Sequence, residues 1–377
     1  MLFKHKLSQS QTKTKMIGKN MLRYKSYATK GAGKKHAPAC QDACFYDSEL
    51  SIIVVADGLG DKNCFRSSRG SQIAVECASA GIQEFLNIYN DEYIKNQIND
   101  LKTWTLVEKE FDQKIHTLIN YIITQWYIRV EIDFTDNPFT EEELNAIDEK
   151  HRIQYAEFDK KSKAYATTLI AAAAAEHYWF GIHIGDGRFT VLYPDGSFAQ
   201  PVPWDDRCFL NNTTTIRDQD AHERTRYHFS AHRSTAHRST AAPVAIYLCS
   251  DGIDDNYPVE KNEEYLYNVY KTISLTFAEA GFESTCKQLD GLVNKFATEG
   301  KADDTSLGVI IDMDGLKKVV SIWQAPIETE KQTSEPITTE NDEKPSSEAI
   351  IEKTDEVEEK THKMTEPTIE IITPTKS

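Results

Sequence analysis

Acidic residues end three apolar stretches of this sequence. Asp57, Asp186 and Asp251 each follow a strand-like apolar run and each precede a glycine. A further acidic pair, Asp303-Asp304, comes just before another apolar run at 305–312. Strand ends are rigid, so side chains placed there can be held close together. The repetition therefore predicts a cluster of carboxylates at the ends of the strands.

Converging carboxylates repel one another, and a bound divalent cation relieves that repulsion. A ligand set made only of oxygen atoms favours Mg²⁺ or Mn²⁺ over zinc. Asp-Gly is also a common turn dipeptide, so any one of these pairs taken alone indicates only a turn. Their repetition after apolar runs favours a metal site.

The strands that end or begin beside these acids must position them. The five alanines at 171–175 favour a helix by propensity, but the β-rich run beside them leads us to interpret both as paired, buried strands. The predicted strands are 23–28, 43–57 as a hairpin, 167–175, 178–184, 189–199 as a hairpin, 244–250 and 305–312. The predicted helices are 67–87, 104–132, 141–162, 261–278 and 281–298.

Charge and composition divide the chain into a body and two tails. We predict a basic, disordered arm at 1–20, a folded domain at 21–325 and an acidic, disordered tail at 326–377. Residues 1–35 contain ten Lys or Arg and no acid, whereas 324–377 contain fourteen acids and six Lys. Within the domain, 205–242 is polar and repeats Ala-His-Arg-Ser-Thr, so we predict a flexible flap or insertion there.

Several classes of protein are disfavoured. The net charge of -16 argues against nucleic-acid binding by the body of the protein, with the basic arm as the exception. The seven cysteines are scattered without a Cys-x-x-Cys pair, which predicts a reducing, cytoplasmic setting. No run approaches the roughly 18 apolar residues that a membrane span needs, so we expect a soluble protein. The sequence does not indicate an oligomeric state.

Five short motifs in order carry a family resemblance. They are Gln41-Asp42, Val55-Ala-Asp57-Gly58, Gly185-Asp186-Gly-Arg188, Ser250-Asp251-Gly252-Ile-Asp-Asp255 and Asp303-Asp304-Thr-Ser306. Together the motifs resemble the metal-dependent serine/threonine protein phosphatases of type 2C, in a bacterial-type branch. The resemblance implies an α+β fold: a four-layer sandwich of two antiparallel β-sheets flanked by helices. It places the metal site at one end of the sandwich.

The resemblance also implies roles for individual residues. Asp57 would bridge two Mg²⁺ or Mn²⁺ ions, and the backbone carbonyl of Gly58 would bind one of them. Asp251 and Asp303 would complete the ligands of one ion. Asp42 would hold the other ion through water.

A third, weaker metal is implied at Asp186 and Asp255. Two cations about 4 Å apart activate the water between them for in-line attack on phosphorus, without a covalent intermediate. No cysteine is followed six residues later by Arg, so the loop of thiol-based phosphatases is missing. The implied function is hydrolysis of phosphoserine or phosphothreonine on a protein partner, with a cognate kinase as a further partner.

Two departures from the family leave alternatives open. Ala37 stands where many members carry a phosphate-clamping Arg, and Leu59 stands where eukaryotic members carry His. His36 or Lys35 is a candidate phosphate-binding substitute, although both are also consistent with ordinary surface charges. The alternatives are a weak or inactive type 2C-fold module that binds or regulates a phosphoprotein, and a phosphatase of a small phosphoester.

Overall fold

The computed structural model describes residues 23–33, 40–97, 101–155, 158–208, 212–231, 241–257, 261–299 and 303–325. The predicted arm at 1–20, the predicted tail at 326–377 and the candidate phosphate-binding residues Lys35 and His36 lie outside these ranges.

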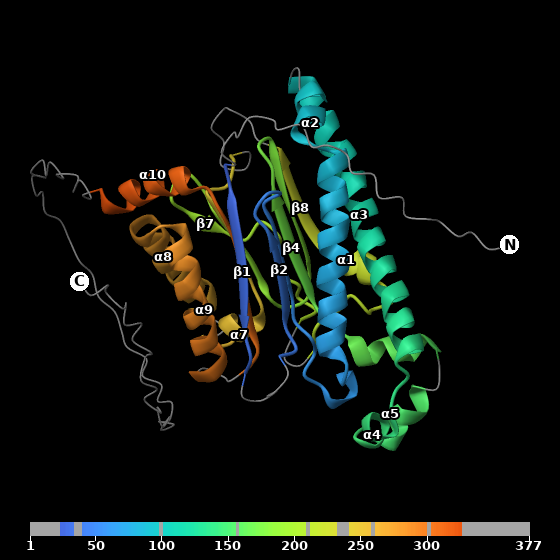
Figure 1. The fold of residues 1–377 in the computed structure, drawn as a ribbon. Helices are drawn as coiled ribbons and strands as arrows, with labels where there is room; N and C mark the ends of the chain where they lie inside the picture. The colour runs from blue at the N-terminus through green and yellow to red at the C-terminus, as the bar shows by residue number, and fades with distance from the viewer. Residues whose placement is uncertain are drawn as a thin grey trace, which may run out of the picture. The chain divides into compact units, whose positions relative to one another are not determined.

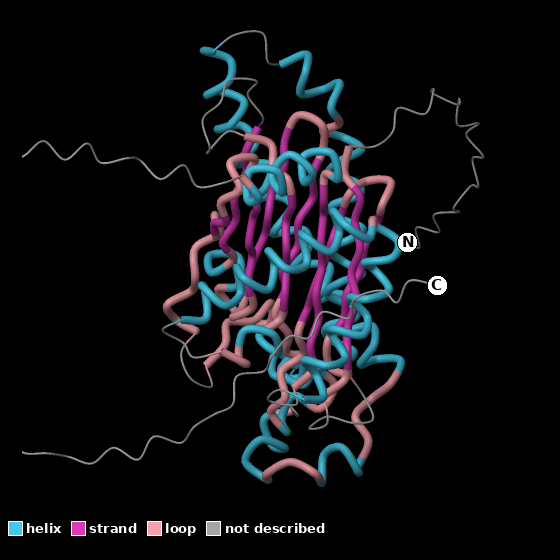
Figure 2. Tube along the Cα trace, turned by 90° about the vertical axis from the view of Figure 1, so that its left-hand side faces the viewer, coloured by secondary structure: helices cyan, strands magenta, loops and turns pink. Residues whose placement is uncertain are grey.

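The described residues form two five-stranded sheets in which all paired strands are antiparallel. The first sheet has the order β1 (Lys25–Gly31), β10 (Thr305–Ile311), β9 (Ala245–Cys249), β6 (Arg188–Leu192) and β7 (Phe198–Ala199). The second has the order β2 (Ala43–Asp47), β3 (Ile52–Ala56), β4 (Leu169–Ala174), β5 (Tyr178–Ile184) and β8 (Arg226–Ala231). Figure 2 shows the strands running side by side.

Helices cover the outer faces of both sheets (Figure 1). The second sheet is covered by α1 (Ser67–Ile88) and α3 (Leu101–Asp136). The first is covered by α8 (Asn262–Ala280), α9 (Phe282–Glu299) and α10 (Met313–Gln324). The shorter helices are η1 (Lys62–Cys64), α2 (Asp91–Gln97), α4 (Glu141–Asn145), α5 (Glu149–Gln154), η2 (Phe158–Tyr165), α6 (Ala221–Arg224) and α7 (Asp251–Asp254). The predicted α+β, four-layer sandwich is confirmed.

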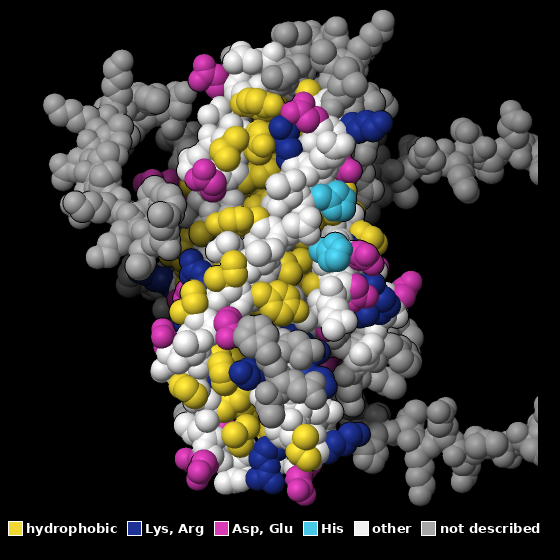
Figure 3. Space-filling view, turned by 90° about the vertical axis from the view of Figure 1, so that its right-hand side faces the viewer, with side chains coloured by type: hydrophobic (Ala, Val, Ile, Leu, Met, Phe, Trp, Pro, Cys, Tyr) yellow, Lys and Arg dark blue, Asp and Glu magenta, His cyan; other side chains and the backbone are white. Residues whose placement is uncertain are grey.

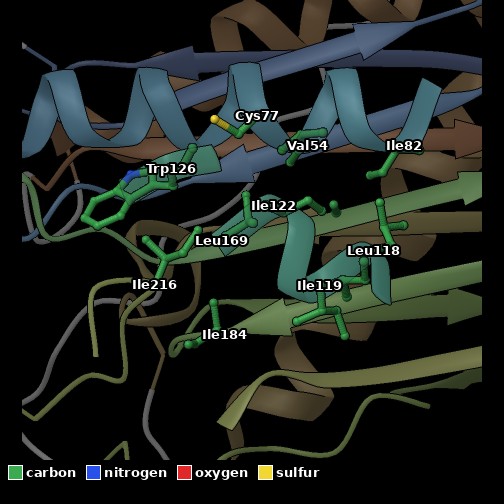
Figure 4. Close-up of a cluster of buried hydrophobic side chains, with 14 of the residues drawn as sticks. Val54, Cys77, Ile82, Leu118, Ile119, Ile122, Trp126, Leu169, Ile184 and Ile216 are labelled. Carbon is green, nitrogen blue, oxygen red and sulfur yellow. The ribbon is translucent and has the colours of Figure 1, made fainter. Parts of the chain in front are cut away.

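Three apolar cores hold these layers together. One lies between the sheets and includes Ile53, Trp179 and Ile246, all fully buried. A second joins the first sheet to α8, α9 and α10. The third joins the second sheet to α1 and α3, where Trp126 and Ile122 of α3 lie close to the sheet (Figure 4). Apolar burial on both faces of each sheet is the main stabilising contribution.

The alanine run forms a strand, as predicted. Ala171 and Ala173 face the core beneath α1, whereas Ala172 and Ala174 face the core between the sheets. A strand that is buried on both faces shows no polar alternation. Tertiary packing therefore overrides the helical propensity of alanine at this position.

The predicted helix at 141–162 was wrong. The segment is divided into α4, α5 and η2, although Thr140 begins α4 with the predicted acidic first turn and forms a capping box with Glu143. Ile147, between α4 and α5, and Tyr155, just after α5, are both buried. Packing of these separate side chains replaces the single apolar face that one long helix would bury.

The flap prediction was wrong for 226–231. These residues form β8, which pairs with β5 from Tyr178↔Ala231 to His183↔Arg226. Strand β8 occupies a sheet edge and is only partly buried along most of its length, which explains its polar sequence. Helix α10 was not predicted either; the Asp312 side chain caps its first turn.

Apolar side chains remain exposed on the face formed by α1 and α3 (Figure 3). They include Ile88, Tyr121, Ile128 and Ile132.

Within the described ranges, no helix combines the length and the apolar character that crossing a bilayer requires.

A partly buried histidine makes stability depend on pH. The His228 ring of β8 packs against the Trp179 ring at a tilt, with ring centroids 4.6 Å apart, and desolvation lowers its pKa to about 4. The unfolded chain binds this proton near pH 6.5, so the stabilisation is present above that pH and is lost as the pH falls toward 4. Between pH 7 and 4.5, we expect the wild type to lose about 2 kcal/mol more unfolding free energy than His228→Phe. Urea unfolding at both pH values measures the difference, and equal losses would contradict it.

Candidate active site

Strand register brings the predicted site residues to the ends of paired strands. Asp57 follows β3 and Asp42 precedes β2, and these strands pair with Ala43 opposite Ala56. Asp251 likewise follows β9 where that strand pairs with the beginning of β10. In Figure 1, α7, which begins at Asp251, lies at the lower end of the sandwich.

The carboxylate of Asp57 is influenced by two other acids. Burial, followed by the charges of Asp42 and Asp251, raises the pKa of Asp57 well above its usual value. Burial also raises the pKa of Asp42 to about 6 and that of Asp251 to about 8. Neighbouring ionised carboxylates repel one another, so the site favours a bound proton or cation.

Two threonines hold the backbone of Asp57 in place. Its N–H donates to the Thr168 hydroxyl at 3.0 Å. Its carbonyl accepts from the Thr167 hydroxyl at 2.8 Å and from the Thr168 N–H at 2.8 Å. Neither threonine could be predicted as a support of the site, because Asp57 lies more than a hundred residues earlier in the chain.

Asp42 has one satisfied carboxylate oxygen and one unsatisfied oxygen. Its Oδ2 accepts from the Ser306 hydroxyl at 2.7 Å, and the Ser306 N–H donates to the Ser250 hydroxyl at 2.9 Å. Its Oδ1 is buried and finds no hydrogen-bond partner in the described part of the protein. An unsatisfied buried carboxylate oxygen is costly unless a proton donor or a cation approaches it.

Gly58 occupies a position that excludes a side chain. A Cβ atom there would lie 2.7 Å from the backbone oxygen of Gln41 and 2.8 Å from that of Ser67. The glycine therefore lets the chain after β3 run against the segment that carries Asp42.

The acidic pair before β10 divides into two roles. Asp304 is buried and accepts from the Gly33 N–H at 2.7 Å and the Gln41 N–H at 2.6 Å. It therefore ties together the segments that flank 34–39. Asp303 is partly exposed, and its Oδ1 accepts from the Asp304 N–H at 3.0 Å.

Asp186 and Asp255 lie in the electrostatic neighbourhood of Asp251. The charges of both contribute, after burial, to the raised pKa of Asp251. Burial raises the pKa of Asp186 too, while a hydrogen bond from the Thr213 hydroxyl partly offsets the rise. The structure thus places Asp42, Asp57 and Asp251 within electrostatic reach of one another, and Asp186 and Asp255 within reach of Asp251.

Arg188 forms a buried ion pair that the sequence analysis did not single out. Its Nε donates to Oδ2 of Asp254 at 2.7 Å, and its guanidinium lies 3.7 Å from the centre of the Trp204 ring. The Asn262 side chain donates to the same carboxylate oxygen at 3.0 Å. The pair fixes α7, and with it Asp251, against β6.

Replacing Arg188 with Met should destabilise the protein by about 3–5 kcal/mol, because it leaves the Asp254 charge buried without its partner. The double variant Arg188→Met/Asp254→Leu should recover most of that loss. Urea unfolding of the wild type, both single variants and the double variant measures the coupling. A single variant as stable as the wild type would contradict a structural role for the pair.

The donor set fits a hard divalent cation. The buried groups are carboxylate oxygens, and one oxygen of Asp42 lacks a partner among the described residues. The described ranges contain no ready-made group of three or more His, Cys, Asp or Glu side chains around one point. The charges of Asp42 and Asp251 both act on Asp57. A small number of protein oxygen ligands suits Mg²⁺ or Mn²⁺, since such ions keep several water ligands.

Comparison with known protein families shows the family of this chain. The sequence profile of the protein phosphatase 2C family matches residues 33–291, well over half of the chain. The protein therefore belongs to the protein phosphatase 2C family, and the predicted resemblance is confirmed. A search of curated proteins found no match.

Solved structures with a similar fold include three bacterial phosphatases. The serine/threonine phosphatase PstP/Ppp of Mycobacterium tuberculosis is 15% identical, with 76% of this chain and 98% of that chain covered and a TM-score of 0.42. Stp1 of Staphylococcus aureus is 14% identical, with 77% and 95% covered and a TM-score of 0.42. PppA of Pseudomonas aeruginosa is 16% identical, with 76% and 97% covered and a TM-score of 0.43.

Proposed function

We propose that this protein hydrolyses phosphoserine or phosphothreonine on protein substrates, using Mg²⁺ or Mn²⁺ held by the strand-end carboxylates. The observation that carries the proposal is the gathering of Asp42, Asp57 and Asp251 at strand ends, where the charges of Asp42 and Asp251 both raise the pKa of Asp57. Membership of the protein phosphatase 2C family supports the reaction class.

The proposed ligands divide between two ions. Asp57 would contact both, with the Gly58 carbonyl, Asp251 and Asp303 on one side and Asp42 on the other. When bound, the ions would lower the pKa of a water molecule and neutralise charge on the phosphoryl oxygens. Thr167 and Thr168 fix the Asp57 backbone, so the carboxylate is oriented before substrate arrives.

The remaining site assignments are also proposals. Asp186 and Asp255 would hold a third, weaker ion, which is consistent with their influence on the pKa of Asp251. His36 or Lys35 would bind the phosphate. All seven cysteines are free, which supports a reducing, cytoplasmic setting.

Removal of metal should abolish activity. Purified full-length protein is mixed with p-nitrophenyl phosphate or a phosphothreonine peptide in Mn²⁺, and then with excess EDTA. We expect turnover in Mn²⁺ to fall at least ~100-fold on chelation, because the water loses its activating cations. Added Mn²⁺ should restore the rate. Activity that persists in EDTA would refute the metal-dependent mechanism.

The two substrates also separate the proposal from its rivals. Hydrolysis of the peptide with a much higher kcat/KM than that of small phosphoesters supports a protein phosphatase. The reverse preference would favour a small-molecule phosphatase. Absence of turnover together with absence of Mn²⁺ binding in a calorimetric titration would favour an inactive binding module.

A further inference from the structure

The segment 213–217 runs from the neighbourhood of Asp57 and Asp186 to a cavity that is lined by residues of 212–224. The Thr213 hydroxyl donates to the carboxylate of Asp186. Further along, the Ile216 N–H donates to the Thr167 carbonyl at 3.0 Å, next to the hydroxyl that supports Asp57. Both ends of the segment are therefore hydrogen-bonded to residues of the proposed active site or to their immediate supports.

Packing holds the end of this segment in a defined position. The Ile216 side chain is fully buried and lies near Leu169 and Ile184 (Figure 4). The next residue, Arg217, accepts a hydrogen bond at its carbonyl from the Tyr127 hydroxyl of α3. The backbone that carries the Arg217 side chain is thus anchored on both sides.

The Arg217 side chain faces this cavity of about 580 Å³, which is lined by polar residues from 212–224. Its Nε is buried, and no hydrogen-bond acceptor for it exists among the described residues. The other cation of the cavity, Arg224, is already engaged with Asp220 at 2.6 Å and Asp218 at 3.6 Å. The Nε of Arg224 also lacks a hydrogen bond of good geometry, but its charge is paired, whereas no ion pair of Arg217 is found among the described residues.

The charge of Arg217 also reaches the loop that follows β3. Burial raises the pKa of the Cys64 thiol to about 12, and the Arg217 charge offsets part of that rise. The Tyr155 hydroxyl donates to the Asn63 carbonyl, and the Arg217 charge also offsets part of the rise that burial causes in the pKa of Tyr155. The guanidinium is therefore within electrostatic reach of the chain that leaves Asp57.

We propose that Arg217 binds an oxyanion group of the phosphorylated substrate, either a carboxylate or a second phosphate, beside the residue that is dephosphorylated. A guanidinium offers paired donors that match both groups. A partly buried, unpaired guanidinium is also prepared for a ligand, since its desolvation has already occurred on folding. The inference rests on the proposed function and assigns it a preference for acidic or multiply phosphorylated sequences.

Binding of three phosphothreonine peptides tests the assignment. The peptides differ only in the flanking residues, which are all alanine, all glutamate, or include a second phosphoserine. Binding is measured by fluorescence anisotropy on the full chain with Asp57→Asn, so that the peptides are not consumed. Arg217→Ala and Arg217→Lys are then introduced separately into this background. Gln219→Ala is the matched control, because Gln219 is exposed in the same cavity.

We expect at least one anionic peptide to bind ~10-fold or more tightly than the alanine peptide, as for a charge-assisted hydrogen bond. Arg217→Ala should remove this preference, Arg217→Lys should retain part of it, and Gln219→Ala should retain all of it. The peptide that benefits identifies the anion as carboxylate or phosphate. The assignment would be overturned if the preference for the anionic peptide survived Arg217→Ala or were lost to the same extent in Gln219→Ala. Equal binding of all three peptides by the Arg217-containing protein would overturn it too.

The outcome is independent of catalysis. Should the wild type hydrolyse no substrate, the proposed function fails, whereas the binding comparison still decides the role of Arg217. In an active enzyme, Arg217→Ala should raise KM for the preferred peptide ~10-fold with a smaller change in kcat, since the contact is made equally in the bound substrate and the transition state. A ~10-fold fall in kcat with an unchanged KM would contradict a substrate-binding role.

Discussion

Replacing Asp57 with Asn should reduce turnover of a phosphothreonine peptide at least ~100-fold while leaving the protein folded. The substitution removes the carboxylate whose pKa is raised by the charges of both Asp42 and Asp251. A loss of ~100-fold corresponds to about 2.7 kcal/mol of transition-state stabilisation. Turnover in saturating Mn²⁺ measures the effect, and urea unfolding checks the fold.

Stability should be unchanged or slightly increased in Asp57→Asn, because the repulsion that raises the pKa of these buried acids is relieved. Asp314→Asn is the matched control, since Asp314 is an exposed carboxylate at the start of α10 and contacts only the surface Lys317 among the described residues. The control should keep full activity. Retention of more than a tenth of the wild-type rate by Asp57→Asn would count heavily against a bridging role.

Replacing Gly70 with Ala should destabilise the protein by about 3 kcal/mol or more. A Cβ atom at this position of α1 would lie 1.8 Å from the backbone oxygen of Tyr165. Neither backbone can yield easily, because the Gly70 carbonyl accepts from Trp126 Nε1 at 3.0 Å. The residues after Tyr165 lead directly to Thr167 and Thr168, so the displacement should also lower activity.

A second helical glycine provides the control for this prediction. Gly291 lies in α9, and a Cβ atom there would meet nothing within 4 Å. Gly291→Ala should stabilise the protein by about 0.5–1 kcal/mol, because alanine loses less backbone entropy in a helix. If packing decides the outcome, the two variants should change the free energy of unfolding in urea in opposite directions. Equal effects would mean that the close contact at Gly70 is not maintained in solution.

The sequence could predict the acids of the site because each is marked locally. Asp57 and Asp251 end apolar runs that form β3 in one sheet and β9 in the other. Packing of the two sheets brings the ends of these strands near each other. The strand assignment of the alanine run was also recoverable, since the neighbouring β-rich segment at 178–184 supplies a partner. Local pattern and tertiary structure agree at these positions.

The supports of the site could not be predicted in the same way. Thr167 and Thr168 carry no pattern that identifies Asp57 as their partner, and Arg188 finds Asp254 only after β6 and β9 have paired. Edge strand β8 has a polar sequence because part of it faces solvent, so its composition resembles that of a loop. Such features depend on long-range contacts that no local window contains.

Anomalous scattering from crystals soaked in Mn²⁺ tests the central claim most directly. We predict anomalous peaks in contact with the Asp57 carboxylate, with Asp42 and Asp251 next to them, and loss of these peaks in Asp57→Asn crystals. A fully soaked wild-type crystal with no peak beside Asp57 would contradict the account, whatever activity the protein displays.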